Sequence, residues 1–234
     1  MKKRNLFLLL VIGVPLYYWL AYPSYTYRYR MTVEIDTPEG VKSGSSVIEV
    51  HTIQWPEWLS GLSGGHTTQT TVRGEAVFVD LEKQGMLFTA LRWPNGKTDY
   101  ASLILRDVLP ISPPPKEGYD TPQAAKYYAN LKSERTELKP EQFPLLVRFR
   151  NIDNPKTVEA VDPYKFSIIF GEGTSVKAIT IEMTEDPITY NIDRHLKWLS
   201  KLSGSYLHGG STSRDAPLGL HGGDFQIFKN RNKH

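Results

Sequence analysis

"MTVEIDTPEGVKSGSSVIEV", residues 31–50, is the stretch that decides the fold of this chain. Met31, Val33 and Ile35 alternate with polar residues, which is the period of a strand that buries one face. Pro38-Glu39-Gly40 supplies turn residues, and residues 47–53 have the composition of a returning strand. The stretch therefore predicts a β-hairpin with one apolar face.

Further strands are predicted between residues 76 and 93 and between residues 145 and 184. Residues 76–81 and 86–93 form a second expected strand pair, joined through Gln84-Gly85. "LLVRFR" at 145–150 and "SVKAITIEMT" at 175–184 also alternate, and the latter places Ile179, Ile181 and Met183 on one face.

Helices are indicated mainly by one recurring pair, a capping residue directly before proline. Thr121-Pro122, Asp162-Pro163 and Asp186-Pro187 each combine an N-cap side chain with a proline suited to the first helical position. These pairs predict helices over 122–134, 163–170 and 187–202, and a weaker apolar pattern indicates a short helix over 99–109.

The N-terminal segment is predicted to cross a membrane. Lys2, Lys3 and Arg4 precede an uncharged stretch, 5–27, whose apolar part over 6–22 ends in several aromatic residues. We expect an uncleaved signal anchor, since Trp19 or Tyr22 would occupy a cleavage-site position that requires a small residue; the alternatives are a cleaved signal peptide and a buried core helix. Membrane lipid would then contact residues 5–22.

Domain organisation and location follow from this anchor. Residues 1–4 would be cytoplasmic, 5–27 the transmembrane anchor with its aromatic belt, 28–204 an extracytoplasmic domain and 205–234 a loosely ordered Gly/Ser-rich basic tail. The Pro-rich segment 110–122 is the candidate sub-boundary. The expected location is the inner (cytoplasmic) membrane, single-pass, with the body extracytoplasmic, which is the periplasm if the source is a Gram-negative bacterium. The predicted fold class is α+β, an N-terminal transmembrane helix followed by a mixed, mainly antiparallel β body with about three to four helices.

Composition excludes several classes of function. The chain of 234 residues has no Cys, which rules out a disulfide framework, a thiolate metal site and a Cys nucleophile. Its net charge of +3 equals the three basic residues at positions 2–4, so the rest of the chain is neutral. A neutral body is unsuited to neutralising phosphates, and no nucleic-acid partner is expected.

Three strings resemble a known group of proteins. "MTVEIDTPEGVKSGSSVIEV" at 31–50, "LVRFRNIDNPKTVEAVDP" at 146–163 and "GDF" at 223–225 are similar to segments of bacterial proteins of unknown function that carry one N-terminal membrane helix. The resemblance covers about a fifth of the chain. It implies membrane anchoring and no catalytic residue.

Ser63 is the one candidate nucleophile. "GLSGG" at 61–65 satisfies the G-x-S-x-G pattern, which in hydrolases lifts a serine above a parallel sheet at a strand–turn–helix elbow. Here Trp55-Pro56 precedes it and a Thr-rich strand-like run follows, so a Gly-rich surface turn is the favoured interpretation.

No metal or cofactor is expected. The His residues at 51, 66, 195, 208, 221 and 234 show neither H-x-x-x-H nor H-E-x-x-H spacing. Glu49 and His51 share a strand face, which is typical of a solvated face, and no glycine loop ends in G-K-[ST].

A short motif occurs twice. "WLSGLSG" at 58–64 and "WLSKLSG" at 198–204 differ only in Gly61 against Lys201, but the similarity does not extend outward, which argues against a duplicated domain. We expect each copy to be a helix end that docks its apolar side chains on the core, with Gly204 as a left-handed cap. If these side chains face outward instead, they form a candidate docking patch of Trp58, Leu62, Trp198, Leu199 and Leu202.

The function expected from the sequence is therefore a binding or assembly module of the cell envelope, anchored in a membrane and without catalytic activity. An envelope protein is the expected partner. The alternative is a membrane-tethered serine hydrolase that uses Ser63.

Overall fold

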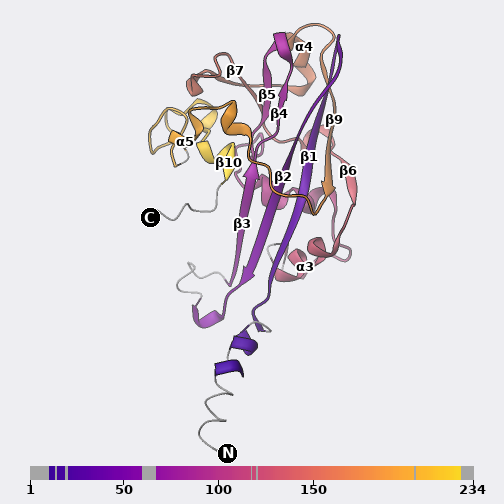
Figure 1. Cartoon of the computed structure of the whole chain (residues 1–234), viewed down its shortest axis with the longest axis vertical. Helices are drawn as coiled ribbons and strands as arrows, with labels where there is room; N and C mark the ends of the chain where they lie inside the picture. The colour runs from indigo at the N-terminus through magenta and orange to yellow at the C-terminus, as the bar shows by residue number, and fades with distance from the viewer. Residues whose placement is uncertain are drawn as a thin grey trace, which may run out of the picture.

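Two long strands, β1 (Ser24–Thr37) and β2 (Gly40–Gln54), form the predicted hairpin and run along the length of the molecule (Figure 1). The structure is a computed structural model that describes residues 11–13, 15–18, 21–59, 67–116, 118, 119, 121–202 and 204–227. Thr37 pairs with Gly40 around the two-residue turn, and Gly40 has φ +117, which only glycine adopts readily. The predicted alternation is confirmed, since Met31, Val33 and Ile35 are fully buried.

The hairpin lies in a six-stranded sheet, the main sheet, with the order β10-β3-β2-β1-β9-β6. All its pairings are antiparallel. The other strands are β3 (Thr68–Glu75), β6 (Arg135–Glu137), β9 (Ser175–Met183) and β10 (Gln226–Ile227). Ile179, Ile181 and Met183 of β9 are buried on the face that β1 also buries, as their alternation predicts. One face of this sheet is thus the core face and the other is polar.

A second sheet packs on the core face of the hairpin. It has the order β4-β5-β7-β8 and contains β4 (Phe78–Asp80), β5 (Met86–Thr89), β7 (Leu146–Phe149) and β8 (Val158–Ala160). The predicted strand pair through Gly85 is present as β4 and β5. The two sheets approach so closely that a Cβ at Gly44 would lie 1.9 Å from the carbonyl oxygen of Phe78. Gly44 is therefore required by contact with a neighbouring backbone.

Helices also contribute to the core. They are α2 (Tyr100–Val108), α3 (Pro122–Asn130), α4 (Phe166–Phe170) and α5 (Leu199–Leu202). Short 3-10 turns lie at Glu82–Gln84, Pro140–Gln142, Pro155–Thr157, Pro163–Lys165, Ile192–Arg194, Pro217–Gly219 and Gly222–Asp224. Both α2 and α3, on the two sides of the Pro-rich segment, contact the main sheet. Tyr29 fixes α2 by donating a hydrogen bond from its hydroxyl to the carbonyl of Ala101 at 2.8 Å.

Two of the three cap–proline pairs begin helical structure as predicted. The Thr121 hydroxyl accepts a hydrogen bond from the Ala124 N–H at 3.3 Å, and the Asp162 carboxylate accepts one from the Tyr164 N–H at 2.9 Å. Asp186-Pro187 does not begin a helix. The helix predicted over 187–202 is replaced by an extended segment, a 3-10 turn at Ile192–Arg194 and α5, because the backbone of residues 187–191 hydrogen-bonds to the main sheet instead.

The predicted transmembrane helix is corrected by the structure. Within the described part of the chain, no helix is both long enough and apolar enough to cross a bilayer. Residues 11–13, 15–18 and 21 are helical, and the remainder of 1–20 lies outside the described residues. The C-terminal end of the predicted anchor belongs to the sheet instead: β1 already begins at Ser24, and Tyr27 is buried with its ring 5.4 Å from that of Tyr128. Aromatic residues assigned to a membrane interface thus continue the alternation of a strand.

The segment predicted as a loose tail contributes to the core over residues 205–227. Leu207, Leu220 and Phe225 are buried, and Phe225 packs against Phe88 and Phe149 between the second sheet and α5. A buried ion pair at 3.2 Å joins Asp224 to Arg92. Gly and Ser in this segment provide tight turns rather than disorder. Residues 228–234 lie outside the described part.

We expect Gly44→Ala to lower the free energy of unfolding by about 3 kcal/mol, the upper end of the range for overpacking, because its methyl group would overlap the Phe78 carbonyl. Gly204→Ala is the matched control. Gly204 has no atom within 4 Å of an added Cβ and no positive φ, so the left-handed cap expected there is not present. Urea unfolding of both variants tests this; equal stabilities would contradict the close approach of the two sheets.

Leu199→Ala should lower the free energy of unfolding by ~2–5 kcal/mol, since the side chain is 1% exposed and its removal leaves a cavity. Ile168→Ala on α4, where the side chain is 78% exposed, should change it by less than about 0.5 kcal/mol. Thermal unfolding of the pair measures the difference.

Candidate functional site

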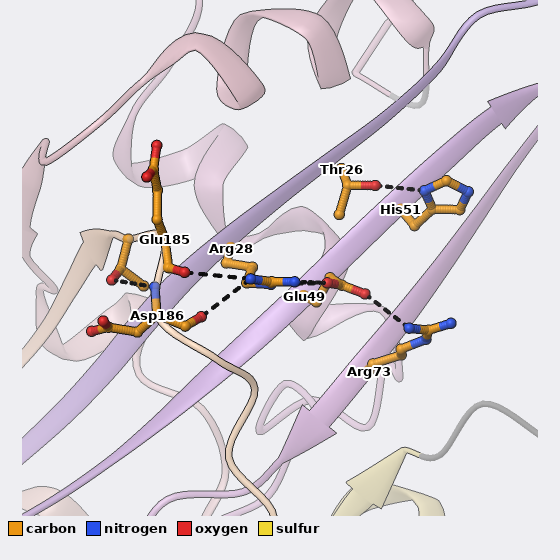
Figure 2. Close-up of polar contacts among 8 residues, drawn as sticks. Thr26, Arg28, Glu49, His51, Arg73, Glu185 and Asp186 are labelled. Atoms are coloured by element: carbon orange, nitrogen blue, oxygen red, sulfur yellow. Dashed lines mark hydrogen bonds and ion pairs between the residues drawn. The ribbon is translucent and has the colours of Figure 1, made fainter.

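The polar face of the main sheet carries an ordered row of charges across three strands. Arg28 on β1 lies opposite Glu49 on β2, and Glu49 lies opposite Arg73 on β3. Arg28 donates from Nε to Glu49 Oε2 at 2.9 Å, and Arg73 donates from Nη1 to Glu49 Oε1 at 3.2 Å (Figure 2). Each carboxylate oxygen therefore has its own guanidinium. Opposite charges in directly facing positions stabilise a sheet.

Glu49 is the most enclosed member of this row. Its side chain is 7% exposed, whereas those of Arg28 and Arg73 are 34% and 31% exposed. A carboxylate taken out of water needs both its partners, because an unpaired buried charge is strongly unfavourable. The expectation that Glu49 lies on an ordinary solvated face is therefore wrong, because its side chain is largely buried. The alternation of β2 alone does not predict the two arginines that cover it.

A second row lies one step further along the same strands. Thr26 Oγ1 and His51 Nδ1 are 2.7 Å apart, and the Thr71 hydroxyl donates to the carbonyl of His51 at 3.3 Å. Figure 2 shows the two rows side by side on the same face. The hydroxyl and imidazole groups of this second row thus lie beside the guanidinium groups of the first row, near the start of β1.

An extended segment, residues 184–191, crosses this face and is called the strap. The strap leaves β9, passes over β1 and β2 and reaches β3 (Figure 1). Thr189 bonds twice with Val47 of β2, through its N–H at 3.3 Å and its hydroxyl at 3.0 Å. Asp186 forms an ion pair with Arg30, and Arg28 Nη1 makes longer contacts of 3.4 and 3.5 Å with the carbonyls of Glu185 and Asp186.

A buried carboxylate holds the far end of the strap. Glu75 of β3 is 1% exposed and accepts hydrogen bonds from the N–H groups of Asn191 and Ile192 at 2.7–2.9 Å. Burial raises the pKa of Glu75, and these N–H groups oppose the change. The strap is therefore fixed at both ends, by Arg28 and Arg30 at β1 and by Glu75 at β3.

Because the chain leaves β9 as the strap, the first part of β1 has no strand partner on the edge opposite β2. β9 pairs with β1 only from Tyr29 to Asp36, whereas β2 pairs with β1 from Ser24 onward. Carbonyl direction alternates along a strand: the Pro23 carbonyl accepts from Gln54 on the β2 side at 3.3 Å, and that of Arg28 accepts from Thr184 on the β9 side at 3.1 Å. Thr26 has the parity of Arg28, so its N–H and C=O point away from β2. Among the described residues, neither group has a backbone partner.

A pocket of about 440 Å³, the edge pocket, lies directly beside this open stretch of β1. α3 and the residues after it form one wall, and the end of β9 forms the other. The apolar part of the lining comes from Tyr27, Tyr128, Ala129, Leu131 and Met183. Burial, and next the neighbouring Tyr27, raise the pKa of the Tyr128 phenol, which therefore stays neutral.

The two walls of the edge pocket are connected by one ion pair. Lys132 Nζ and Glu185 Oε1 are 2.7 Å apart, with side chains 71% and 81% exposed. Their hydrogen bond raises the pKa of Lys132 and lowers that of Glu185. A pair this exposed adds little to the stability of the fold.

Of the residues singled out from the sequence, those that the structure describes do not form one exposed patch. Ser63 and Leu62 lie outside the described residues. Trp58 is 70% exposed, whereas Trp198 and Leu199 are buried and Leu202 is partly buried against the core. The Trp198 indole donates to the carbonyl of Ile152 at 2.8 Å. Within the described ranges, no cluster of His, Asp and Glu side chains has the arrangement of a metal site.

We expect Arg28→Ala to destabilise the protein by about 1 kcal/mol more than Arg73→Ala. Both arginines pair with Glu49, and Arg28 also donates to two carbonyls of the strap, those of Glu185 and Asp186. Arg28→Ala should in addition speed cleavage of residues 184–191 by a broad-specificity protease, measured by mass spectrometry. Equal stability and equal cleavage in the two variants would show that Arg28 does not hold the strap.

No protein-family model, curated protein or solved structure matches this chain. Its function is therefore inferred from its own geometry, in which the open stretch of β1 and the edge pocket beside it are the features that can receive a partner.

Proposed function

We propose that this protein is a binding or assembly protein that receives a polypeptide partner in the edge pocket. The observation that carries the proposal is the open stretch of β1 with a pocket of mixed polar and apolar lining beside it. The pocket volume of about 440 Å³ is within the range of specific binding sites. Its lining combines apolar side chains with a few polar groups at defined positions, as binding sites do.

The lining favours a polypeptide over a small charged ligand. Five apolar residues line the pocket together with one lysine and one glutamate that pair with each other: Tyr27, Tyr128, Ala129, Leu131 and Met183. Arg28 also lines the pocket, but its guanidinium is occupied by Glu49 and the strap. A small anion would therefore find few unoccupied donors, whereas a peptide can use both apolar and backbone contacts.

The proposal is tested by site-specific photo-crosslinking in the organism that encodes the protein. A photoreactive residue at Lys132, on the rim of the edge pocket, should give a covalent adduct of defined mass with one partner. The same residue at Lys126, which is exposed on α3 but does not line the pocket, is the matched control and should not.

Ala129→Trp, which fills the pocket from α3, should abolish the adduct at position 132. Thermal unfolding of this variant, compared with Lys126→Trp on the same helix, verifies that the fold is retained. An adduct that persists in Ala129→Trp, or forms equally from position 126, would contradict the proposal.

A further inference from the structure

The manner of binding can be inferred from the backbone at the edge pocket. We propose that the partner binds as an added β-strand, an extended segment of about five residues that pairs with Ser24–Arg28 of β1 in the place that β9 vacates. This inference rests on the proposed function and specifies the class of partner. In this mode of binding, the main chain of the ligand makes the hydrogen bonds to β1, and its side chains add contacts with the pocket.

The first argument is the direction of the Thr26 peptide groups. Both the N–H and the C=O of Thr26 point to the pocket side of β1, and neither has a backbone partner in the described part of the chain. A donor and an acceptor on one residue, directed to the same side, match the backbone of an extended peptide, which offers an acceptor and a donor in the same spacing.

The second argument is that the sheet already contains the template for the added strand. β9 pairs with β1 up to Tyr29, and Thr184 still donates to the Arg28 carbonyl before the chain turns away as the strap. From Ser24 to Arg28, four steps of ~3.4 Å give a length of roughly 14 Å, enough for a segment of about five residues. The ligand would therefore extend the main sheet along the line of β9.

The third argument selects a single strand over a second copy of the protein. The open stretch of β1 lies between two walls, the end of α3 and the end of β9, which the Lys132–Glu185 pair connects. A second copy would carry the same walls beside its own edge, and these would meet before the two strands could pair. One isolated extended segment has no such walls.

The walls also indicate the side chains of the ligand. On the core-face side of β1, Tyr27, Tyr128 and Met183 offer an apolar surface, and on the polar-face side Thr26 and Lys132 offer polar groups. Because side chains of a strand alternate between the two faces, the ligand should alternate apolar residues with polar or acidic ones.

The test uses the full-length protein and a displayed library of random twelve-residue peptides. Among the peptides that bind the unmodified protein and do not bind Ala129→Trp, the tightest is synthesised with a fluorophore. Its Kd for the protein is measured by fluorescence anisotropy. Thr26→Pro removes the open N–H but leaves pairing with β2, since that N–H points away from β2; proline is tolerated at such edge positions. Thr26→Ala is the matched control, because both variants lose the contact of Thr26 with His51.

Thr26→Pro should weaken binding about tenfold or more, and Thr26→Ala by less than about twofold. Methylation of single backbone nitrogens of the peptide should abolish binding at every second position only, and this readout stands even if Thr26→Pro does not fold. Equal affinity of Thr26→Pro and Thr26→Ala, together with no alternation in the methylation series, would overturn strand addition while leaving a pocket that binds peptides. A library that yields no peptide sensitive to Ala129→Trp would count against both strand addition and the proposed function.

Discussion

The antiparallel pairing of β1 with β2, unbroken from Ser24–Ile53 to Thr37–Gly40, is the interaction on which the other elements depend. It divides the side chains of both strands into an apolar face, on which the second sheet, α2 and α3 pack, and a polar face, which carries the charged rows. A shift of one residue in this register would exchange the two faces entirely. The close contact at Gly44 fixes the second sheet on the same hairpin.

The hairpin is longer than its neighbour β9, and this difference in length generates the candidate site. β9 ends at Met183 because the chain continues as Thr184-Glu185-Asp186-Pro187, where proline has no N–H for a further ladder bond. Arg28 and Arg30 then hold the strap against the polar face through carbonyl and carboxylate contacts. The same residues that direct the strap away from β1 thus leave the first part of β1 open.

An open strand edge is normally a risk of aggregation, and proteins protect such edges with charges or covering segments. In this protein the walls of the edge pocket and the Lys132–Glu185 pair provide that protection. In the proposed mode of binding this protection is selective, because the walls would keep out another sheet and still admit one extended chain. A binding protein that works by strand addition needs this combination of a reachable edge and a guarded one.

The sequence by itself determined the hairpin, the β4–β5 pair, the buried face of β9 and the helix starts at Thr121 and Asp162, because each is encoded by short-range alternation or capping. Asp186-Pro187 carries the same cap–proline pattern, but the backbone N–H groups of Thr189 and Asn191 that follow it donate to Val47 and Glu75, which are distant in sequence. Glu49 likewise looks like an exposed charge until Arg28 and Arg73 are placed on either side of it. The edge pocket was decided only by tertiary structure, since it depends on where β9 stops relative to β1. Alternation and capping depend on residues a few positions apart, so the sequence predicts them. An open strand edge depends instead on where a neighbouring strand ends, and that strand is distant in sequence.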